Sequence, residues 1–192
     1  MRVKSAHLDF LNKNNTMKKL IFPFAIASFM LLSAFTFMNA TSWKIANNYS
    51  IKFTSKDPSG VFTSLKGDVL FDANNLDGSK FDLTIDPASI NTGNGMQNKI
   101  AKNEKWFNVA KYPVIKFTST KISKTATGYE VTGTMDMHGV QKSMTFPFTF
   151  KDNTFAASFD INRTDFNIGG TTGMDAHAAT VLKVDASIPV SK

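Results

Sequence analysis

Two pairs of aspartate and histidine have residue types and a spacing that suit metal binding or proton transfer. Asp136 and His138 are separated by one residue, and Asp175 and His177 repeat that spacing. Residues two apart on a strand face the same side, so each pair would offer a carboxylate and an imidazole to one cation or substrate. Both pairs fall at predicted turns or strand ends, and no third pair accompanies them. We therefore keep a metal-dependent enzyme as an alternative and predict no metal site.

The sequence offers little support for other kinds of catalysis. It contains no cysteine and no Gly-x-Ser-x-Gly motif, the usual carriers of a catalytic thiol or an exposed serine nucleophile. The glycine-rich loop at 169–173 is not followed by Lys-Ser or Lys-Thr, so it does not match a phosphate-binding loop. We predict a binding protein that is not an enzyme and that has no cofactor apart from its ligand.

A few larger side chains are candidates for contact with a ligand. His138 lies at the predicted turn of a hairpin, which favours a hydrogen-bonding turn residue over a contact with a ligand head group. Arg163 and Asp165 are two residues apart, which favours a structural ion pair over an arginine that binds an anion. Trp106 and its neighbour Phe107 either stack across the mouth of a binding site or belong to the core.

The elements that would position these side chains are short strands. Apolar residues alternate with polar or small ones in eight runs separated by Gly, Asn, Asp and Pro, a pattern typical of antiparallel sheet. The runs cover 49–53, 65–71, 81–85, 115–117, 129–137, 144–150, 155–161 and 182–188. Eight antiparallel strands that close on themselves enclose side chains or one slender ligand. The predicted fold is all-β, a single antiparallel eight-stranded barrel.

One segment is predicted to be a helix. Residues 95–107 lack alternation and place Met96, Ile100 and Phe107 near one face, with Ala101 and Trp106 beside it. We expect this short helix to cap one end of the barrel.

The interior of such a barrel is either filled by its own side chains or open to an apolar ligand. Four methionines, at 96, 135, 137 and 144, favour a ligand because methionine adapts to apolar binding surfaces. Gly67 and Gly133, at inward positions, are expected to leave space along the tube. The candidates for the lumen are Phe53, Phe71, Phe117, Val131, Met135, Phe146, Phe148 and Phe159. A bulge that shifts the register by one residue would exchange them for their neighbours.

The first forty residues resemble an export signal and are not expected to be part of the fold. Met17-Lys18-Lys19 forms a positive start, which is also an alternative start of translation, and Asn39-Ala40 provides a small residue for cleavage. We expect cleavage after Ala40 and a periplasmic or secreted protein made of residues 41–192. The apolar run from Leu20 to Met38 is also long enough to span a membrane, so an uncleaved anchor is the alternative.

Residues 41–192 are expected to form one domain with a modest net charge. They hold 17 lysine and arginine residues against 14 acidic residues, because five basic residues and one acidic residue lie in 1–40. The lysines are scattered rather than clustered, so we predict no nucleic-acid partner. Without cysteine, the stability of an exported domain must come from its core, to which twelve of the eighteen phenylalanines can contribute.

Five motifs, in order along the chain, resemble signatures of the YceI-like family. They are SINTGN at 89–94, KWFNVAKYP at 105–113, IKFTST at 115–120, VTGTMDMHGVQK at 131–142 and NRTDF at 162–166. The resemblance spans residues 43–190. In one place the chain departs from the pattern, because many members have Arg-Asp-x-His-Leu where it has Gln97-Asn98-Lys99-Ile100. A contact to a ligand head group by arginine or histidine at that place is therefore not carried over.

The resemblance implies a lipocalin-like barrel, exported in many bacteria, that holds a long polyisoprenoid chain in its lumen. A buried CH₂ group contributes about 0.8 kcal/mol, so such a tube would bind a long tail with few polar contacts. We expect transport or storage of a quinone-like or polyprenyl-like lipid in the periplasm, and we leave open a homodimer and transient contact with a membrane. An exported protein-interaction domain is a further alternative, although a closed barrel offers no free edge strand.

Overall fold

The computed structural model describes residues 40–56 and 58–192. The apolar run of the expected export signal, and the anchor that is its alternative, lie outside these residues. The described chain contains no helix that is long and apolar enough to cross a membrane.

Most of the described chain is β-strand, with one α-helix and three 3₁₀ helices. The strands are β1 (Ser42–Ile45), β2 (Ser50–Thr54), β3 (Gly60–Phe62), β4 (Leu65–Leu70), β5 (Lys80–Ile85), β6 (Ile90–Asn91), β7 (Ile115–Lys124), β8 (Tyr129–Met137), β9 (Val140–Lys151), β10 (Thr154–Asn162) and β11 (Val181–Ser191). The helices are α1 (Gly95–Lys102), η1 (Pro87–Ser89), η2 (Arg163–Phe166) and η3 (Gly173–His177).

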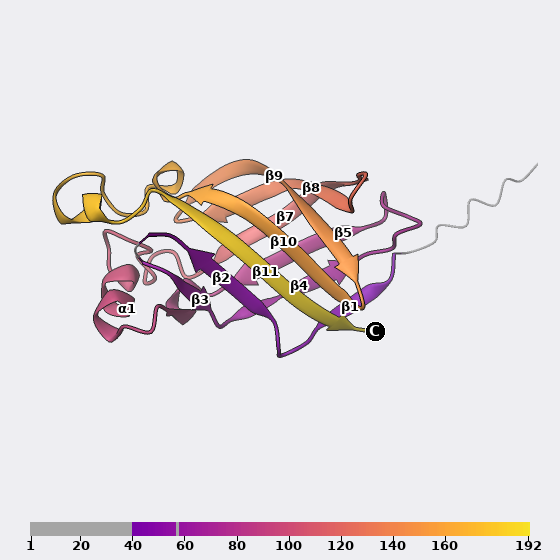
Figure 1. The fold of residues 1–192 in the computed structure, drawn as a ribbon, viewed down its shortest axis with the longest axis horizontal. Helices are drawn as coiled ribbons and strands as arrows, with labels where there is room; N and C mark the ends of the chain where they lie inside the picture. Colours follow the sequence, from indigo (N-terminus) through magenta and orange to yellow (C-terminus); the bar gives the residue numbers. More distant parts are fainter. Residues whose placement is uncertain (1–39, 57) are drawn as a thin grey trace, which may run out of the picture. The chain divides into compact units, whose positions relative to one another are not determined.

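Eight of these strands close into a barrel (Figure 1). The strands β1, β4, β5, β7, β8, β9, β10 and β11 are hydrogen-bonded in that order, and β1 also pairs with β11, which closes the ring. Every one of these pairings is antiparallel. The predicted all-β, antiparallel, eight-stranded barrel is therefore confirmed.

The short strands β2, β3 and β6 extend this ring along β11. β2 pairs with β11 through Lys183 to Ser187, whereas β1 pairs with it through Val190 and Ser191, so β1 and β2 follow each other along one partner. β3 then pairs with β2, and β6 with β3. The break between β5 and β6 is η1, where Pro87 lacks the N–H of a strand and the Asp86 side chain accepts a hydrogen bond from the Ala88 amide.

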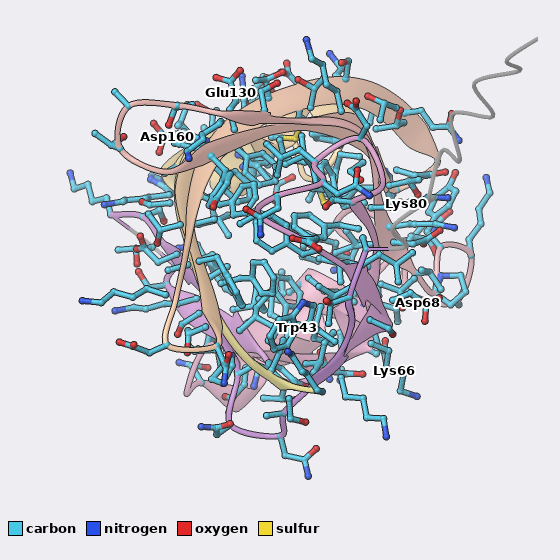
Figure 2. The ribbon with its side chains drawn as sticks, turned by 90° about the vertical axis from the view of Figure 1, so that its right-hand side faces the viewer. Trp43, Lys66, Asp68, Lys80, Glu130 and Asp160 are labelled. Atoms are coloured by element: carbon cyan, nitrogen blue, oxygen red, sulfur yellow. The ribbon has the colours of Figure 1, made fainter. Side chains whose placement is uncertain are left out.

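Apolar side chains fill the inside of the ring and charged ones cover the outside. In the view of Figure 2 Trp43 lies within the ring, whereas Asp68, Glu130 and Asp160 point outward. The alternation reverses once, at a bulge in β7 between Ser119 and Lys121. Before the bulge the odd-numbered residues are buried, and after it Ile122 is buried. A bulge of this kind adds one residue to one strand and so reverses the side that each later side chain faces.

The helix α1 is shorter than predicted and presents a different face. It begins after Asn94, whose side chain accepts hydrogen bonds from the amides of Met96 and Gln97, and it ends at Lys102. At Asn103 the side chain accepts a hydrogen bond from the Lys105 amide, a local turn that competes with helix continuation.

The predicted face is wrong because it does not form as one surface. Met96 is 67% exposed and Ile100 is 42% exposed, whereas Ala101, Trp106 and Phe107 face the interior. An eight-residue helix places Phe107 beyond its last turn, so helical spacing does not relate Phe107 to Met96 and Ile100.

The barrel has two different ends. Its helix end carries α1, η2, η3 and the turn at His138-Gly139, and its aromatic end carries Trp43 and a cluster of phenylalanines. β8 connects them, because it starts at Tyr129, whose ring lies 5.1 Å from that of Phe71, and ends beside His138. Figure 1 shows α1 at the end opposite to the C-terminus.

Candidate functional site

A cavity of about 160 Å³ lies inside the barrel. Strands β2 to β5 and β7 to β11 contribute its wall, and every lining residue is Phe, Ile, Leu, Val, Met or Ala. Six of the predicted lumen residues line it, namely Phe117, Val131, Met135, Phe146, Phe148 and Phe159. The rings of Phe146 and Phe159 stack with centroids 4.2 Å apart. Whether these side chains bind a ligand stays a prediction.

A second cavity, of about 100 Å³, lies under the helix end. Gln97 and Ala101 of α1 line it, together with Trp106, Phe107 and Phe53. The two cavities adjoin, because four residues line both. These are Phe62, Met137, Ile161 and Val184. The interior is therefore a pair of apolar compartments in series, with the predicted residues Phe53 and Trp106 in the second compartment and not in the first.

Arg163 lines the second cavity but uses its guanidinium to hold the loop above it. Its Nε donates to the Ala179 carbonyl at 3.0 Å, and its Nη1 donates to the Ile168 carbonyl at 2.6 Å. Its Nη2 donates to three more carbonyls, those of Gly170, Asp175 and Ala178, at 3.0 to 3.2 Å. The guanidinium carbon also lies 5.0 Å from the centre of the Trp106 ring.

The environment of this arginine is that of a structural residue. Arg163 is only 4% exposed, and burial lowers the pKa of its guanidinium, a shift that the Asp175 carboxylate opposes. The expected ion pair with Asp165 is wrong, because Asp165 lies 3.9 Å from Lys142 instead. The physical reason is local conformation: residues 163–166 form a 3₁₀ helix, in which residues two apart do not share a face as they do on a strand.

His138 is a turn residue that lines neither cavity. Its φ of 54° places it in the left-handed region, and its Nδ1 lies 3.1 Å from the Phe166 carbonyl oxygen. Its ring packs against that of Tyr112, with centroids 4.5 Å apart. Within the described part of the chain, its buried Nε2 has no hydrogen-bond partner. His138 thus connects the β8–β9 turn to η2.

The two aspartate and histidine pairs do not assemble into a metal centre among the described residues. Asp136 accepts a hydrogen bond from the Gln141 side chain at 2.9 Å, and the Asp175 carboxylate accepts one from the Gly170 amide. His177 lies exposed in η3. Residues 40–56 and 58–192 contain no group of three or more His, Cys, Asp or Glu side chains that is placed to hold a metal ion.

Aromatic rings close the far end of the barrel. Phe71 is 1% exposed, and the centroids of four rings lie within 5.1 to 5.8 Å of its own. They belong to Tyr129, Phe148, Phe150 and Phe155. Trp43 donates from Nε1 to the Phe71 carbonyl at 2.9 Å. Phe71, predicted in the lumen, therefore lies inside the barrel but lines neither cavity.

The space inside the barrel comes from alanines and not from the glycines that the sequence suggested. A Cβ on Gly133 would lie 2.5 Å from the Thr118 carbonyl oxygen and 2.6 Å from the Phe117 ring, so this position is already filled. A Cβ on Gly67 would lie 2.0 Å from the Asp82 carbonyl oxygen. Both glycines permit close approach of a neighbouring strand, and the expectation that they leave space is wrong.

Two alanines missed by the sequence reasoning do line the first cavity. Ala157 on β10 and Ala186 on β11 are direct cross-strand partners, and both lie at inward positions. Because both side chains are small and lie next to each other on adjacent strands, they leave space inside the barrel. The signal that identifies them is a small residue at the inward position of each of two adjacent strands, which requires the strand pairing to be known.

Comparisons with known proteins agree with this architecture. The family model described as the YceI-like domain matches residues 38–190. A UPF0312 protein of Photorhabdus laumondii is 32% identical over 64% of this chain and 69% of its own length. Protein YceI of Salmonella arizonae is 31% identical over 57% of this chain, and the chain spans 62% of that protein's length.

Solved structures share the fold. BcnA of Burkholderia cenocepacia is 28% identical, with a TM-score of 0.67 over 75% of this chain and 96% of that one. The polyisoprenoid binding domain from Saccharophagus degradans is 18% identical, with a TM-score of 0.57 over 78% of this chain and 97% of that domain. Because the family model covers most of the sequence and the barrel is the same, the chain belongs to the YceI-like family.

Proposed function

We propose that this protein binds a long apolar chain of the isoprenoid type inside the barrel and carries or stores it without changing it chemically. The observation that carries the proposal is the wall of the first cavity, which contains no polar side chain among the described residues. A wall of that kind recognises a ligand by shape and by the removal of apolar surface from water. The likeness to a domain named for polyisoprenoid binding supports the same class of ligand.

The hydrophobic effect supplies most of the free energy of such a complex. A five-carbon isoprene unit gains about 4 kcal/mol on full burial, at about 0.8 kcal/mol per carbon. Two buried units therefore reach about 8 kcal/mol, the free energy of a micromolar complex, before the entropy of ordering the chain is subtracted. Affinity then rises with the number of units that fit inside.

A long chain occupies both compartments in this proposal. The first cavity alone is of the size that holds a molecule like benzene. A longer chain passes between the residues that separate the compartments, and Met137 is one of them. Methionine is unbranched and changes shape at little cost, so it is suited to a position where the wall must yield to a ligand.

The second cavity adds little polar recognition to this binding. The Thr92 hydroxyl is hydrogen-bonded to the Asn94 carbonyl and to the Asn98 side chain. The Arg163 guanidinium is occupied by five backbone carbonyls. The protein therefore recognises the apolar chain of its ligand, and the head group of that ligand is quinone-like or polyprenyl-like.

The place of action in the proposal is the periplasm or the exterior of the cell. It rests on the sequence pattern of an export signal that ends at Ala40. The intact mass of the protein recovered from an exporting host tests this part separately. A mass that corresponds to 41–192 supports export and cleavage, whereas a chain that retains residues 20–38 in the membrane fraction supports the anchor.

The experiment that tests the ligand is mass spectrometry of an organic extract of the protein, purified from an exporting host without detergent. We expect a stoichiometric long-chain isoprenoid. As a second arm, the stripped protein is titrated with an isoprenoid alcohol series of increasing length, and affinity is expected to rise with length until the two compartments are full. An extract without lipid, together with no binding of any alcohol in the series, would refute the proposal.

A further inference from the structure

A cavity reaches the helix end of the barrel, whereas packed rings fill the aromatic end. The aromatic end is closed by Phe71 and the rings around it, and the Trp43 Nε1 donates a hydrogen bond to the Phe71 carbonyl there. At the other end the second cavity lies directly under α1, with Gln97 and Ala101 in its wall. The surface of the helix end is therefore the surface that a ligand donor would meet.

Exposed apolar side chains gather at this same end. Among the described residues, the large hydrophobic side chains that stand out to solvent are Met96, Ile100, Val114 and Val181, which are 67%, 42%, 47% and 51% exposed. Met96 and Ile100 lie one turn apart on the outer face of α1.

The strand pairings place Val114 and Val181 at the helix end as well. Val114 comes directly before β7, whose start pairs with the end of β5. Val181 is the first residue of β11 and pairs with Asn162, the residue that caps η2. Among the described residues, all four exposed large hydrophobic side chains thus lie at this end of the barrel and none lies at the other.

The segment that contains α1 is also positively charged. Residues 95–111 contain four lysines, at positions 99, 102, 105 and 111, and one acidic residue, Glu104. Within the described residues none of these lysines forms an ion pair, so their charge is not cancelled locally. A helix with apolar side chains outward and lysines around them matches the surface of a bilayer that contains anionic lipids.

We infer that the helix end docks on an anionic lipid bilayer, with Met96 and Ile100 inserted at the surface and the lysines against the headgroups. That the barrel is loaded in this position rests on the proposed function, whereas docking itself does not. The partner is a lipid surface and not a second protein, because the lysines that accompany Met96 and Ile100 complement the headgroups of anionic lipids.

The absence of cysteine allows a site-specific test. Met96→Cys and Lys80→Cys in the full chain are each labelled with an environment-sensitive fluorophore, and Lys80 serves as the control because it starts β5 at the aromatic end. The labelled proteins are mixed with vesicles of equal parts phosphatidylcholine and phosphatidylglycerol, without isoprenoid. Both carry the same residues 1–39, so any effect of that segment on binding is shared.

We expect the label at position 96 to shift to the blue and to be quenched by doxyl-labelled lipid, and the label at position 80 to do neither. The charge variant Lys99→Glu plus Lys105→Glu is expected to weaken vesicle binding about 25-fold, at about fivefold for each of the two lysines lost. The matched variant Lys80→Glu plus Lys124→Glu has the same net charge and is expected to bind as the unchanged protein does.

Two results would overturn the inference. One is an equal response of the labels at 96 and 80, which would show that no particular end meets the membrane. The other is an equal loss of binding in the two charge variants, which would show attraction by net charge alone. Because the vesicles contain no isoprenoid, neither result bears on whether the barrel binds one.

Discussion

Replacing Ala157 by leucine should stabilise the ligand-free protein and weaken its binding of lipid. Ala157 lines the first cavity, which measures about 160 Å³. At about 24 cal/mol per Å³, a cavity of that size left empty destabilises the fold by about 4 kcal/mol. Leucine adds three carbons, which return about 2.4 kcal/mol if they enter the empty space without strain. We expect the free energy of unfolding to rise by about 2 kcal/mol.

The same side chain competes with a ligand for the space. A ligand that must displace the leucine loses about 2 kcal/mol, so its affinity should fall about 30-fold. Urea unfolding of the stripped protein measures the first effect, and titration with an isoprenoid alcohol measures the second. Ala110→Leu on the surface is the matched control, because it adds the same atoms at an exposed position and should change neither quantity.

A second substitution tests whether the free space lies beside Ala157 and not beside Gly133. Gly133→Ala adds one carbon where the Phe117 ring and the Thr118 carbonyl already lie, so it should destabilise the protein by about 1 to 3 kcal/mol. If Ala157→Leu also lowers the free energy of unfolding and leaves lipid binding unchanged, then the cavity beside Ala157 is not available space, and the basis of the proposed function fails.

Three further substitutions probe the residues that hold the two ends. Arg163→Lys should lower the free energy of unfolding by about 3 kcal/mol, because an ammonium group with three donors cannot reach five carbonyls. The same variant should speed hydrogen exchange at residues 168–179, and unchanged exchange there would contradict the assignment. His138→Val should destabilise by about 1 to 3 kcal/mol in urea, since a β-branched residue is strained at a φ of 54°, whereas His138→Asn should be tolerated better. Trp43→Phe removes the donor to the Phe71 carbonyl and should cost about 1 kcal/mol in the same assay; no loss would mean that water replaces the donor.

The barrel could be predicted from the sequence because strands have a period of two. Each of the eight alternating runs lies in or beside a strand of the structure, and the runs at 129–137 and 144–150 mark a hairpin. The strands at 42–45, 60–62 and 90–91 were not predicted, because four or fewer residues cannot display alternation. The bulge in β7 was equally invisible, since it depends on the pairing with β8 and not on the residues of β7 alone.

For the candidate site, the sequence predicted which side chains point inward but not where the cavity lies. Alternation identifies which residues point inward, but the position of a cavity depends on which inward residues are small and on how the rings stack. Phe71 and Phe146 have the same sequence signal, yet Phe71 packs among four other rings and Phe146 borders the cavity. Gly133 is smaller than Ala157, yet the ring of Phe117 fills the space beside it.

Arg163 shows why a local pattern was insufficient at the helix end. The spacing of Arg163 and Asp165 indicates an ion pair only if the backbone is extended, and here the chain turns into a 3₁₀ helix. The carbonyls that the guanidinium binds come from residues up to sixteen positions away. No short motif reports such a network, because its acceptors are backbone atoms that every residue has.

The two ends of the barrel are held by different forces, and this difference fits a protein that must admit a ligand. At the aromatic end, rings pack on rings, and opening would expose a large apolar surface to water. At the helix end, none of the residues of α1 is fully buried, and the loop after β10 is held both by hydrogen bonds from Arg163 and by the buried side chains of Phe166 and Ile168. Hydrogen bonds exchange with water at a small net cost, whereas buried apolar surface does not. We therefore expect displacement of α1, which buries no residue fully, to require less free energy than opening the aromatic end.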